Sequence, residues 1–324
     1  MKNLYNSINQ KSIIIIGGGP AGTACAIQLK RYDFPALLIE KSEIGGLLIN
    51  ANRVENYLGF PDGISGEVLV KKIQTHYKKN EIETCFENVV SLEYIENNFI
   101  VKTVKNKYFS EIVVIASGTK PKILENQKIP GSIINKVFYE IKNIRRSQNQ
   151  TIGIIGAGDA AFDYALNLSK KNKVIIFNKN QTIKCLPLLF RQSLNSTNIT
   201  YLENRKLIRL SESEKGIRAK FNFFNKDENY LLDYIIFAIG REPELDFLHS
   251  SVINCYDELL KNKKLFVTGD VKNGITRQMS IAAGDGVKTA MIIKDLGKRD
   301  GIPQEVYKNN DHTIKPKWDA IPDD

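Results

Sequence analysis

The pattern of apolar and polar positions divides the chain into alternating strand-like and helix-like stretches. Residues 13–16 are four consecutive isoleucines, a run too short for a buried helix that fits a strand covered on both faces. A helical stretch follows to about Arg31, residues 36–39 give a second apolar strand, and helical spacing returns in 68–79. Alternation of this kind predicts an α/β fold with a parallel sheet.

Short alternating strands follow in the middle of the first half of the chain. The stretches 89–92, 99–103 and 108–110 predict an antiparallel insertion. A separate apolar strand in 111–118 then ends in small residues and is expected to rejoin the first sheet. The preceding stretch 41–66 combines glycine, asparagine and proline with few periodic apolar positions, so it predicts a long ordered loop, and such loops are usually functional.

The same plan is then repeated. A strand in 151–155 leads into a glycine turn and a helix, and 173–177 supplies the next strand. Further strands are expected at 198–202, 207–211, 216–224, 230–232, 233–240 and 265–268, with a helix at 280–293 and an irregular tail over 298–324. The repetition predicts two Rossmann-like, three-layer dinucleotide-binding units in one α/β chain.

Each unit carries a glycine-rich turn between its first strand and first helix. In the first unit Gly17, Gly19 and Gly22 form G-x-G-x-x-G, and Pro20 stands where the first turn of a helix tolerates proline. Such a turn places a pyrophosphate at the helix N-terminus. Glu40 ends the second strand, where a ribose 2′-hydroxyl requires an acceptor.

The second turn differs from the first in its charge. Gly156 and Gly158 begin G-x-G-x-x-A, but Asn178 stands where Glu40 stood, and Lys179 and Lys184 follow. Loss of the acid removes a repulsion against a 2′-phosphate, and lysines attract one. The second unit is therefore expected to bind NADPH, with NADH as the alternative.

Composition limits the other function classes. The 324 residues are 42% apolar and 25% charged, which is typical of a globular protein with more than one core. The net charge of +10 favours acidic partners, but it is spread along the chain without a basic block, so nucleic-acid binding is not expected. No apolar run approaches the ~18 residues of a membrane span and the first residues include no apolar segment, which predicts a cytoplasmic protein without membrane contact.

The cysteines are far apart in sequence. Cys25, Cys85, Cys185 and Cys255 form no Cys-x-x-Cys pair and no zinc-like cluster, and the three histidines are equally scattered. We therefore expect no bound metal, and each cysteine is interpreted as a small buried hydrophobe.

Taken together, the motifs resemble those of the thioredoxin-reductase-like flavoproteins. The resemblance covers 11 to about 296 and rests on GGGPAG, Glu40, Gly45–Gly46, VENYLGFPDGISG, ASGTKP, GAGDAA, AIGREP, TGDV and RQMSIAAGDG, in that order. It implies an FAD domain of 1–118 and 241–324 that is interrupted by an NAD(P)H domain of 119–240. It also implies a homodimer.

The resemblance assigns site residues to both cofactors. The glycines of the first turn would meet the FAD pyrophosphate, Glu40 the ribose, Asp270 the ribityl chain, and Gln278 the isoalloxazine. The full FAD set is Gly17, Gly19, Pro20, Ala21, Gly22, Glu40, Lys41, Gly46, Leu47, Asn56, Val89, Ala116, Ser117, Gly118, Gly269, Asp270, Gln278, Met279 and Ala282. The NADPH set is Gly156, Gly158, Asp159, Ala160, Asn178, Lys179, Lys184, Ile239 and Gly240.

One departure from the family pattern affects the function. Thioredoxin reductases carry a redox Cys-x-x-Cys shortly before the second glycine turn, whereas this chain has 136–143, KVFYEIKN, there. Thiol–disulfide exchange is impossible without thiols. The stretch is more similar to the thioredoxin-reductase-like ferredoxin/flavodoxin–NADP reductases, so an acidic ferredoxin or flavodoxin is the expected acceptor. The alternatives are direct reduction of a small disulfide, a quinone or oxygen, and a non-catalytic flavin-binding redox sensor.

Overall fold

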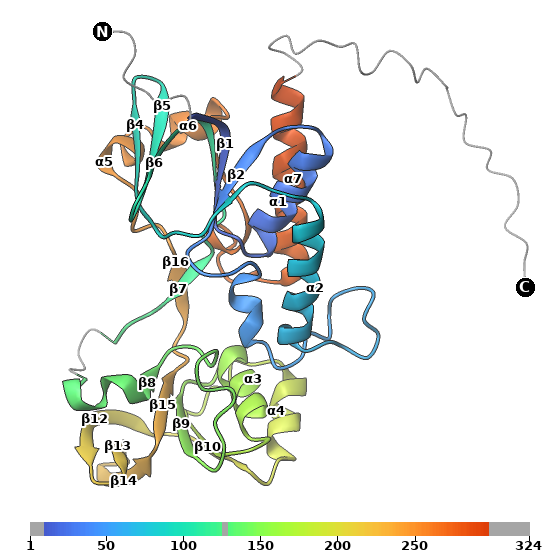
Figure 1. The fold of residues 1–324 in the computed structure, drawn as a ribbon. Helices are drawn as coiled ribbons and strands as arrows, with labels where there is room; N and C mark the ends of the chain where they lie inside the picture. Colours follow the sequence, from blue (N-terminus) through green and yellow to red (C-terminus); the bar gives the residue numbers. More distant parts are fainter. Residues whose placement is uncertain (1–9, 125–128, 298–324) are drawn as a thin grey trace, which may run out of the picture.

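The computed structural model describes residues 10–124 and 129–297, and it forms two α/β domains (Figure 1). The tail predicted for 298–324 lies outside the described residues. The first domain contains β1 (Gln10–Ile16), α1 (Pro20–Arg31), β2 (Ala36–Ile39), η2 (Gly46–Asn50), α2 (Gly66–Lys79), β3 (Thr84–Cys85), β4 (Val89–Ile95), β5 (Asn98–Thr103) and β6 (Lys107–Ile115). It is completed by α5 (Ser250–Ile253), α6 (Tyr256–Lys261), β17 (Leu265–Val267), η4 (Gly269–Val271) and α7 (Met279–Gly297).

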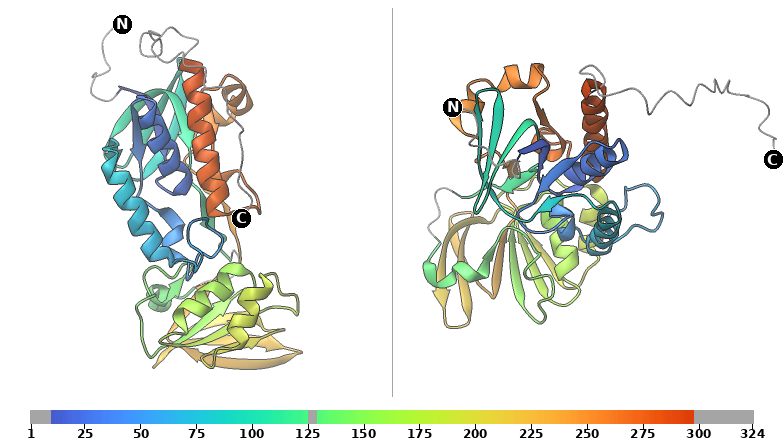
Figure 2. Two further views of the ribbon diagram at one scale, coloured as in Figure 1. Left: turned by 90° about the vertical axis from the view of Figure 1, so that its right-hand side faces the viewer. Right: turned by 45° about the horizontal axis from the view of Figure 1, so that its top comes forward.

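The four isoleucines of β1 lie at the centre of the first sheet, whose order is β3-β2-β1-β6-β5-β4 with β17 beside β6. Ile13 and Ile15 face the core under α1 and α7, and Ile14 and Ile16 face the core formed with β4, β5, α5 and α6. Both faces of β1 are thus covered, as its unbroken apolar run predicted. Figure 2 shows α1, α2 and α7 together on one side of this sheet.

The predicted antiparallel insertion is wrong in one respect. Residues 108–110 and 111–118 are not two strands, because β6 runs without a break from Lys107 to Ile115. Its first residues pair antiparallel with β5, while the same strand pairs parallel with β1 along its length. The β4–β5 hairpin therefore extends the parallel sheet.

The second domain has a parallel sheet of its own. Its order is β11-β10-β9-β15-β8, and the strands β12, β13 and β14 form a separate antiparallel sheet. Phe177 and Phe221 stack across the two sheets with their ring centroids 4.0 Å apart. The elements are η3 (Gly131–Lys136), β8 (Val137–Phe138), β9 (Thr151–Ile155), α3 (Asp159–Leu168), β10 (Lys173–Phe177), α4 (Pro187–Leu194), β11 (Ile199–Leu202), β12 (Lys206–Ser213), β13 (Gly216–Phe223), β14 (Lys226–Leu232) and β15 (Tyr234–Phe237).

A narrow ribbon links the two domains. The chain leaves the first sheet through β7 (Thr119–Pro121) and returns through β16 (Arg241–Pro243), and these two strands pair only with each other. The second domain is thus inserted into the first, which confirms the predicted nested plan. Within the described parts of the chain no helix has both the length and the apolar character required to cross a membrane.

Candidate functional site

Each glycine of the first turn is required for a different steric reason. Gly17 has φ +106, and a Cβ there would lie 2.4 Å from the carbonyl oxygen of Ala116. At Gly22 a Cβ would lie 1.9 Å from the oxygen of Gly17, so this glycine lets α1 pack against the turn. At Gly19 no atom of the described residues lies within 4 Å of the Cβ position. The turn is therefore closed around its first and third glycines and open at the second, where a pyrophosphate would lie.

Glu40 is buried and bound to the same turn. Its Oε2 accepts a hydrogen bond of 2.7 Å from Gly18 N, and its Oε1 accepts one of 2.9 Å from Ser42 N. Each carboxylate oxygen can accept a second hydrogen bond, so both can still receive ribose hydroxyls. The backbone amides fix the side chain at the end of β2, where the sequence placed it.

A groove of about 730 Å³ runs over the carboxyl ends of β1 and β2. It is lined by five residues predicted to contact FAD, namely Gly17, Glu40, Lys41, Val89 and Ser117. Glu87, Asn88, Glu244, Asp246 and Phe247 also line it and were missed by the sequence analysis. The edge where parallel strands end is the usual ligand site of an α/β sheet.

Other predicted FAD residues gather around the same turn. Gly46 lies against Gly19, since its Cβ would be 3.0 Å from Gly19 Cα, and Gly45 N donates to Gly18 O over 2.8 Å. Gly269 faces Ala21, with 2.6 Å between its Cβ position and Ala21 Cβ. The chain thus brings residues about 250 positions apart into one cradle, of which Pro20, Ala116 and Ala282 are further parts. Gly118 follows Ser117 of the groove.

At one end of the cradle the loop after η2 meets the start of α7. Asn56 Nδ2 donates a hydrogen bond of 2.7 Å to Gln278 Oε1. Both side chains are exposed. Leu47, in η2, and Met279, the residue after Gln278, are partly exposed. The structure therefore joins two segments that were predicted to contact FAD, one of which carries Gln278, the residue expected beside the isoalloxazine.

Asp270 provides a test of whether the cradle fits FAD. Its Oδ1 is buried and has no hydrogen-bond partner among the described residues. Burial raises the pKa of this carboxyl, and the nearby charges of Arg277 and Arg241 oppose the rise. An orphaned buried acceptor is costly unless a ligand donates to it, and a hydroxylated chain such as the ribityl group supplies such donors.

The second domain repeats the geometry of the first turn. A Cβ at Gly156, which has φ +135, would lie 2.3 Å from Ala238 O, as Gly17 does with Ala116. Gly158 precedes α3, where Asp159 Oδ1 accepts a hydrogen bond of 2.7 Å from Leu186 N. Ala160 is exposed beside it, and Ile239 and Gly240 follow β15 at the same edge of the sheet. The turn is ready for a second pyrophosphate.

Asn178 does not play the part of Glu40. Its Nδ2 donates to Thr182 O over 3.0 Å and to Tyr201 Oη over 2.9 Å, so the side chain is used to fold the loop after β10. Lys179 and Lys184 remain exposed on this loop. Of the three residues predicted for this loop, Lys179 and Lys184 are therefore the two whose side chains could bind a 2′-phosphate.

The prediction that every cysteine is buried is wrong for Cys85, Cys185 and Cys255, which are partly exposed. All four are free, and Cys25 is fully buried in α1, where burial raises its pKa to about 12. In the portion that the structure describes, no cluster of three or more His, Cys, Asp or Glu side chains could hold a metal ion.

The comparisons with known proteins agree with this geometry. Residues 11–286 match the model of the pyridine nucleotide-disulphide oxidoreductase family. The chain belongs to this family. It is 28% identical to a thioredoxin reductase of Borreliella burgdorferi over 85% of this chain and 89% of that protein. It is also 28% identical to a 34.2 kDa protein in the rubredoxin operon of Clostridium pasteurianum, over 87% and 96% of the two chains.

Solved structures share the fold. The thioredoxin reductase of T. acidophilum superposes with a TM-score of 0.78 at 23% identity, over 90% of this chain and 99% of that chain. The predicted thioredoxin-reductase-like flavoprotein with two Rossmann-like domains is thereby confirmed. FAD and NADPH are the cofactors of this group, and the chain is a flavin-dependent pyridine nucleotide oxidoreductase.

Proposed function

We propose that the protein passes reducing equivalents from NADPH, through FAD, to a one-electron protein acceptor of the ferredoxin or flavodoxin kind, without a redox dithiol. The observation that carries this proposal is the segment 136–143, in which Tyr139 and Lys142 have the spacing of a Cys-x-x-Cys pair but neither is a cysteine. Disulfide exchange requires a thiolate at such a site.

The burial of Cys25 supports a mechanism without thiols. Its pKa of about 12 leaves almost no thiolate at neutral pH. Cys85, Cys185 and Cys255 lie at β3, before α4 and before α6, and no two of the four cysteines are paired. An acceptor that takes electrons directly from the flavin needs no thiol relay.

The first domain would hold FAD and the second would hold NADPH, with their boundary at the β7–β16 ribbon. The turn at Gly19 would receive the FAD pyrophosphate, Glu40 a ribose, and Asp270 the ribityl hydroxyls. Bound flavin supplies the chemistry, accepting a hydride and releasing single electrons. The protein's own contribution is to fix both cofactors and to keep Asp270 in an electropositive setting beside Arg277 and Arg241.

The net charge of +10 supports an acidic protein acceptor, because complementary charge raises the rate of encounter. We also propose a homodimer, which light scattering would detect as twice the chain mass of 36.6 kDa. A monomeric mass would contradict that part of the proposal.

The deciding experiment has two steps. Anaerobic NADPH should bleach the bound flavin of the purified protein, and NADPH oxidation should then be measured with ferredoxin, flavodoxin, thioredoxin, a small disulfide, a quinone and oxygen. The proposal expects the highest kcat/KM with ferredoxin or flavodoxin and a rate that falls as ionic strength rises. Preference for a disulfide, quinone or oxygen would overturn the acceptor, and failure to bleach would favour a non-catalytic redox sensor.

A further inference from the structure

The ribbon that joins the two domains is too slight to fix their orientation. β7 and β16 share three residue pairs, from Arg241↔Pro121 to Pro243↔Thr119, and neither strand joins a larger sheet. An isolated two-stranded ribbon is only marginally stable. Other contacts between the domains must therefore determine how the second domain lies on the first.

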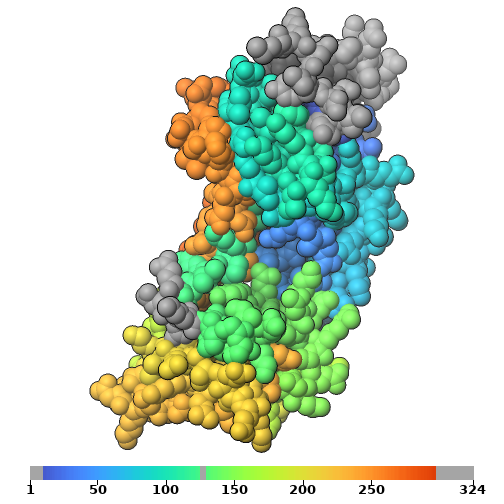
Figure 3. All heavy atoms as spheres, turned by 60° about the vertical axis from the view of Figure 1, so that its left-hand side comes forward, coloured from blue at the N-terminus to red at the C-terminus, as the bar shows by residue number. Residues whose placement is uncertain are grey.

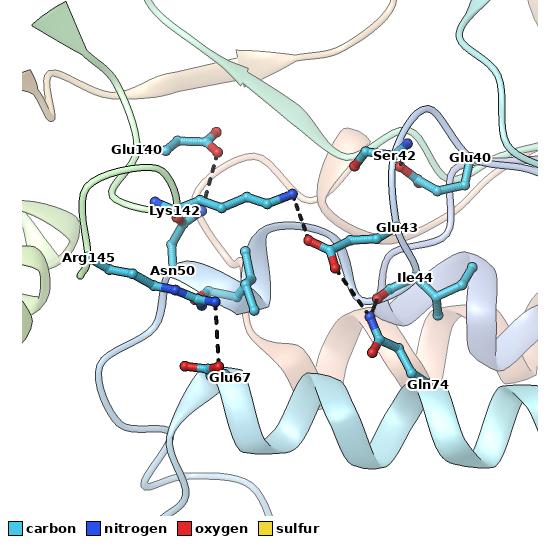
Figure 4. Close-up of polar contacts among 11 residues, drawn as sticks. Glu40, Ser42, Glu43, Ile44, Asn50, Glu67, Gln74, Glu140, Lys142 and Arg145 are labelled. Atoms are coloured by element: carbon cyan, nitrogen blue, oxygen red, sulfur yellow. Dashed lines mark hydrogen bonds and ion pairs between the residues drawn. The ribbon is translucent and has the colours of Figure 1, made fainter. Parts of the chain in front are cut away.

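One segment of the second domain supplies most of these contacts (Figure 4). Lys142 Nζ lies 2.6 Å from Glu43 Oε1, and Lys142 N donates a hydrogen bond of 2.9 Å to Asn50 Oδ1. Asn50 Nδ2 in turn donates to Glu140 Oε2 over 3.3 Å. The hydrogen bond from Lys142 lowers the pKa of Glu43, so the pair is charged at neutral pH.

Two arginines extend the contact along α2. Arg145 Nη2 and Arg146 Nη2 lie 3.6 and 3.5 Å from Glu67 Oε1, in the first turn of that helix. Arg145 Nη1 also donates to Ile49 O over 3.4 Å. We call Glu43, Glu67, Lys142, Arg145 and Arg146 the clasp. Each of its ion pairs joins an acid of the first domain to a base of the second.

The segment that carries the basic residues of the clasp is anchored in the second domain and tied to the ribbon. Ile141 and Ile144, which alternate with the clasp residues, are buried in the core of the second domain. Glu140 Oε1 lies 3.0 Å from Nη1 of Arg241, a residue of β16, so the same segment is also tied to the ribbon. Figure 3 shows the surface on which the blue atoms of the first domain meet the green atoms of the second.

The position of this segment gives the clasp its significance. Tyr139 and Lys142 stand in the stretch that carries the dithiol in thioredoxin reductases. Where the family has a reactive thiol, this chain therefore has a lysine that forms an ion pair with the other domain. We propose that the clasp, with Lys142 and Glu43 as positioning residues, fixes the orientation of the second domain on the first for transfer between the two cofactors. The inference rests on the proposed function only in assigning one cofactor to each domain.

The physical basis is that hydride transfer requires the reacting atoms to lie about 3–3.5 Å apart. A domain that samples several orientations spends less time in any productive one. Several exposed ion pairs acting together give a preference that salt weakens. Loss of the ion pair between Lys142 and Glu43 should thus let the second domain sample more orientations and slow the reduction of the flavin.

The test is a charge-reversal cycle on FAD-loaded protein. Glu43→Lys and Lys142→Glu are made singly and together, and Lys220→Glu, which breaks the pair of Lys220 with Asp227 inside the second domain, is the matched control. Small-angle X-ray scattering reports the arrangement of the domains, and stopped-flow absorbance reports the reduction of the flavin by NADPH. Neither measurement involves an acceptor, so a wrong acceptor assignment would leave the result intact.

We expect each single reversal to broaden the distance distribution and to slow flavin reduction at least threefold at low salt. The double variant should recover both, the control should change neither, and wild type in 0.5 M salt should shift toward the single variants. Scattering that is unchanged in the single variants, or is not restored in the double variant, would overturn the clasp. Altered scattering with unchanged or faster flavin reduction would overturn its positioning role.

Discussion

Lys184 and Ala157 are joined by a backbone hydrogen bond of 2.9 Å, from Lys184 N to Ala157 O. Gly45 and Gly18 make the equivalent bond of 2.8 Å in the first domain. In both domains, therefore, the loop after the second strand folds back on the glycine turn. In the second domain Lys184 stands where the first domain has Gly45, which places a charge beside the nucleotide turn.

The first prediction concerns this charge. Replacing Lys179 and Lys184 together by Ala should raise the KM for NADPH about tenfold or more and leave NADH nearly unchanged, because a charge-assisted contact is worth ~1.5–3 kcal/mol. The backbone bond to Ala157 does not involve either side chain, so the loop should keep its fold. Steady-state kinetics with both coenzymes measure the effect, with Lys173→Ala at the other end of β10 as the control. Equal losses for the two coenzymes would contradict the assignment.

The second prediction uses the open space at Gly19. Its φ of −70 is allowed to any residue, and its Cβ meets nothing within 4 Å. Gly19→Val should therefore fold normally but occupy the space of the pyrophosphate, and it should retain less than about a tenth of the flavin. Absorbance at the flavin band and circular dichroism measure the two properties.

The neighbouring glycines provide the contrast. Gly22→Ala would place a methyl group 1.9 Å from the oxygen of Gly17 and should damage folding itself. Gly131→Val, at another site where no described residue lies within 4 Å of the Cβ position, should change neither property. Full flavin content in Gly19→Val would show that no pyrophosphate passes this turn.

The third prediction is that no cysteine takes part in turnover. A variant with Cys25→Ala and with Cys85, Cys185 and Cys255 changed to Ser should still be reduced by NADPH. Cys25 is fully buried, so its truncation leaves a small cavity that costs about 1 kcal/mol of stability. Stopped-flow measurement of flavin bleaching checks the result, and a folded, flavin-loaded variant that fails to bleach would revive a thiol mechanism.

The fourth prediction concerns Asp163, which accepts a hydrogen bond of 2.9 Å from Asn52 N across the domain boundary. Burial raises its pKa from 3.8 to about 6, with Lys170 opposing the rise and Asp159 adding to it. The folded protein thus holds this proton more tightly than the unfolded chain. Protonated Asp163 therefore contributes to the free energy of unfolding below about pH 4, and this contribution is lost as the pH rises through 6.

Asp163→Asn removes this titration and keeps an oxygen that can accept the bond from Asn52. The variant should match wild type at pH 4 and be up to about 3 kcal/mol more stable at pH 8, since one pKa unit corresponds to about 1.4 kcal/mol. Chemical denaturation across this range measures the difference. A constant difference between the two proteins at every pH would contradict the prediction.

The elements that the sequence predicts well are those with strong local signals. The strand 173–177 matches β10, and α1 ends at Arg31 as its spacing indicates. Gly22 was identifiable because its close neighbour, Gly17 O, lies in the same turn, and Gly17 because the turn itself gives it a φ of +106. α4 was missed because its eight residues show no clear helical spacing of apolar and polar positions. Pro187 also looks like a helix breaker, although at this position it begins the helix.

Contacts between distant segments could not be predicted in the same way. Glu244, Asp246 and Phe247 line the groove only because β16 returns the chain beside β7. Nothing near Glu140 in sequence indicates that Arg241, about 100 residues later, lies beside it. Such pairs depend on how two finished domains meet, and this arrangement leaves no periodic pattern in either segment.

The insertion of one domain into another also affects how the chain is made. α7 packs so closely on α1 that a Cβ at Gly286 would lie 2.0 Å from Ala21 O, and β17 pairs with β6. Both elements leave the ribosome only after the whole second domain. The face of α1 that includes Ala21 and Cys25 therefore stays uncovered during most of synthesis, and the domain that begins first is completed last.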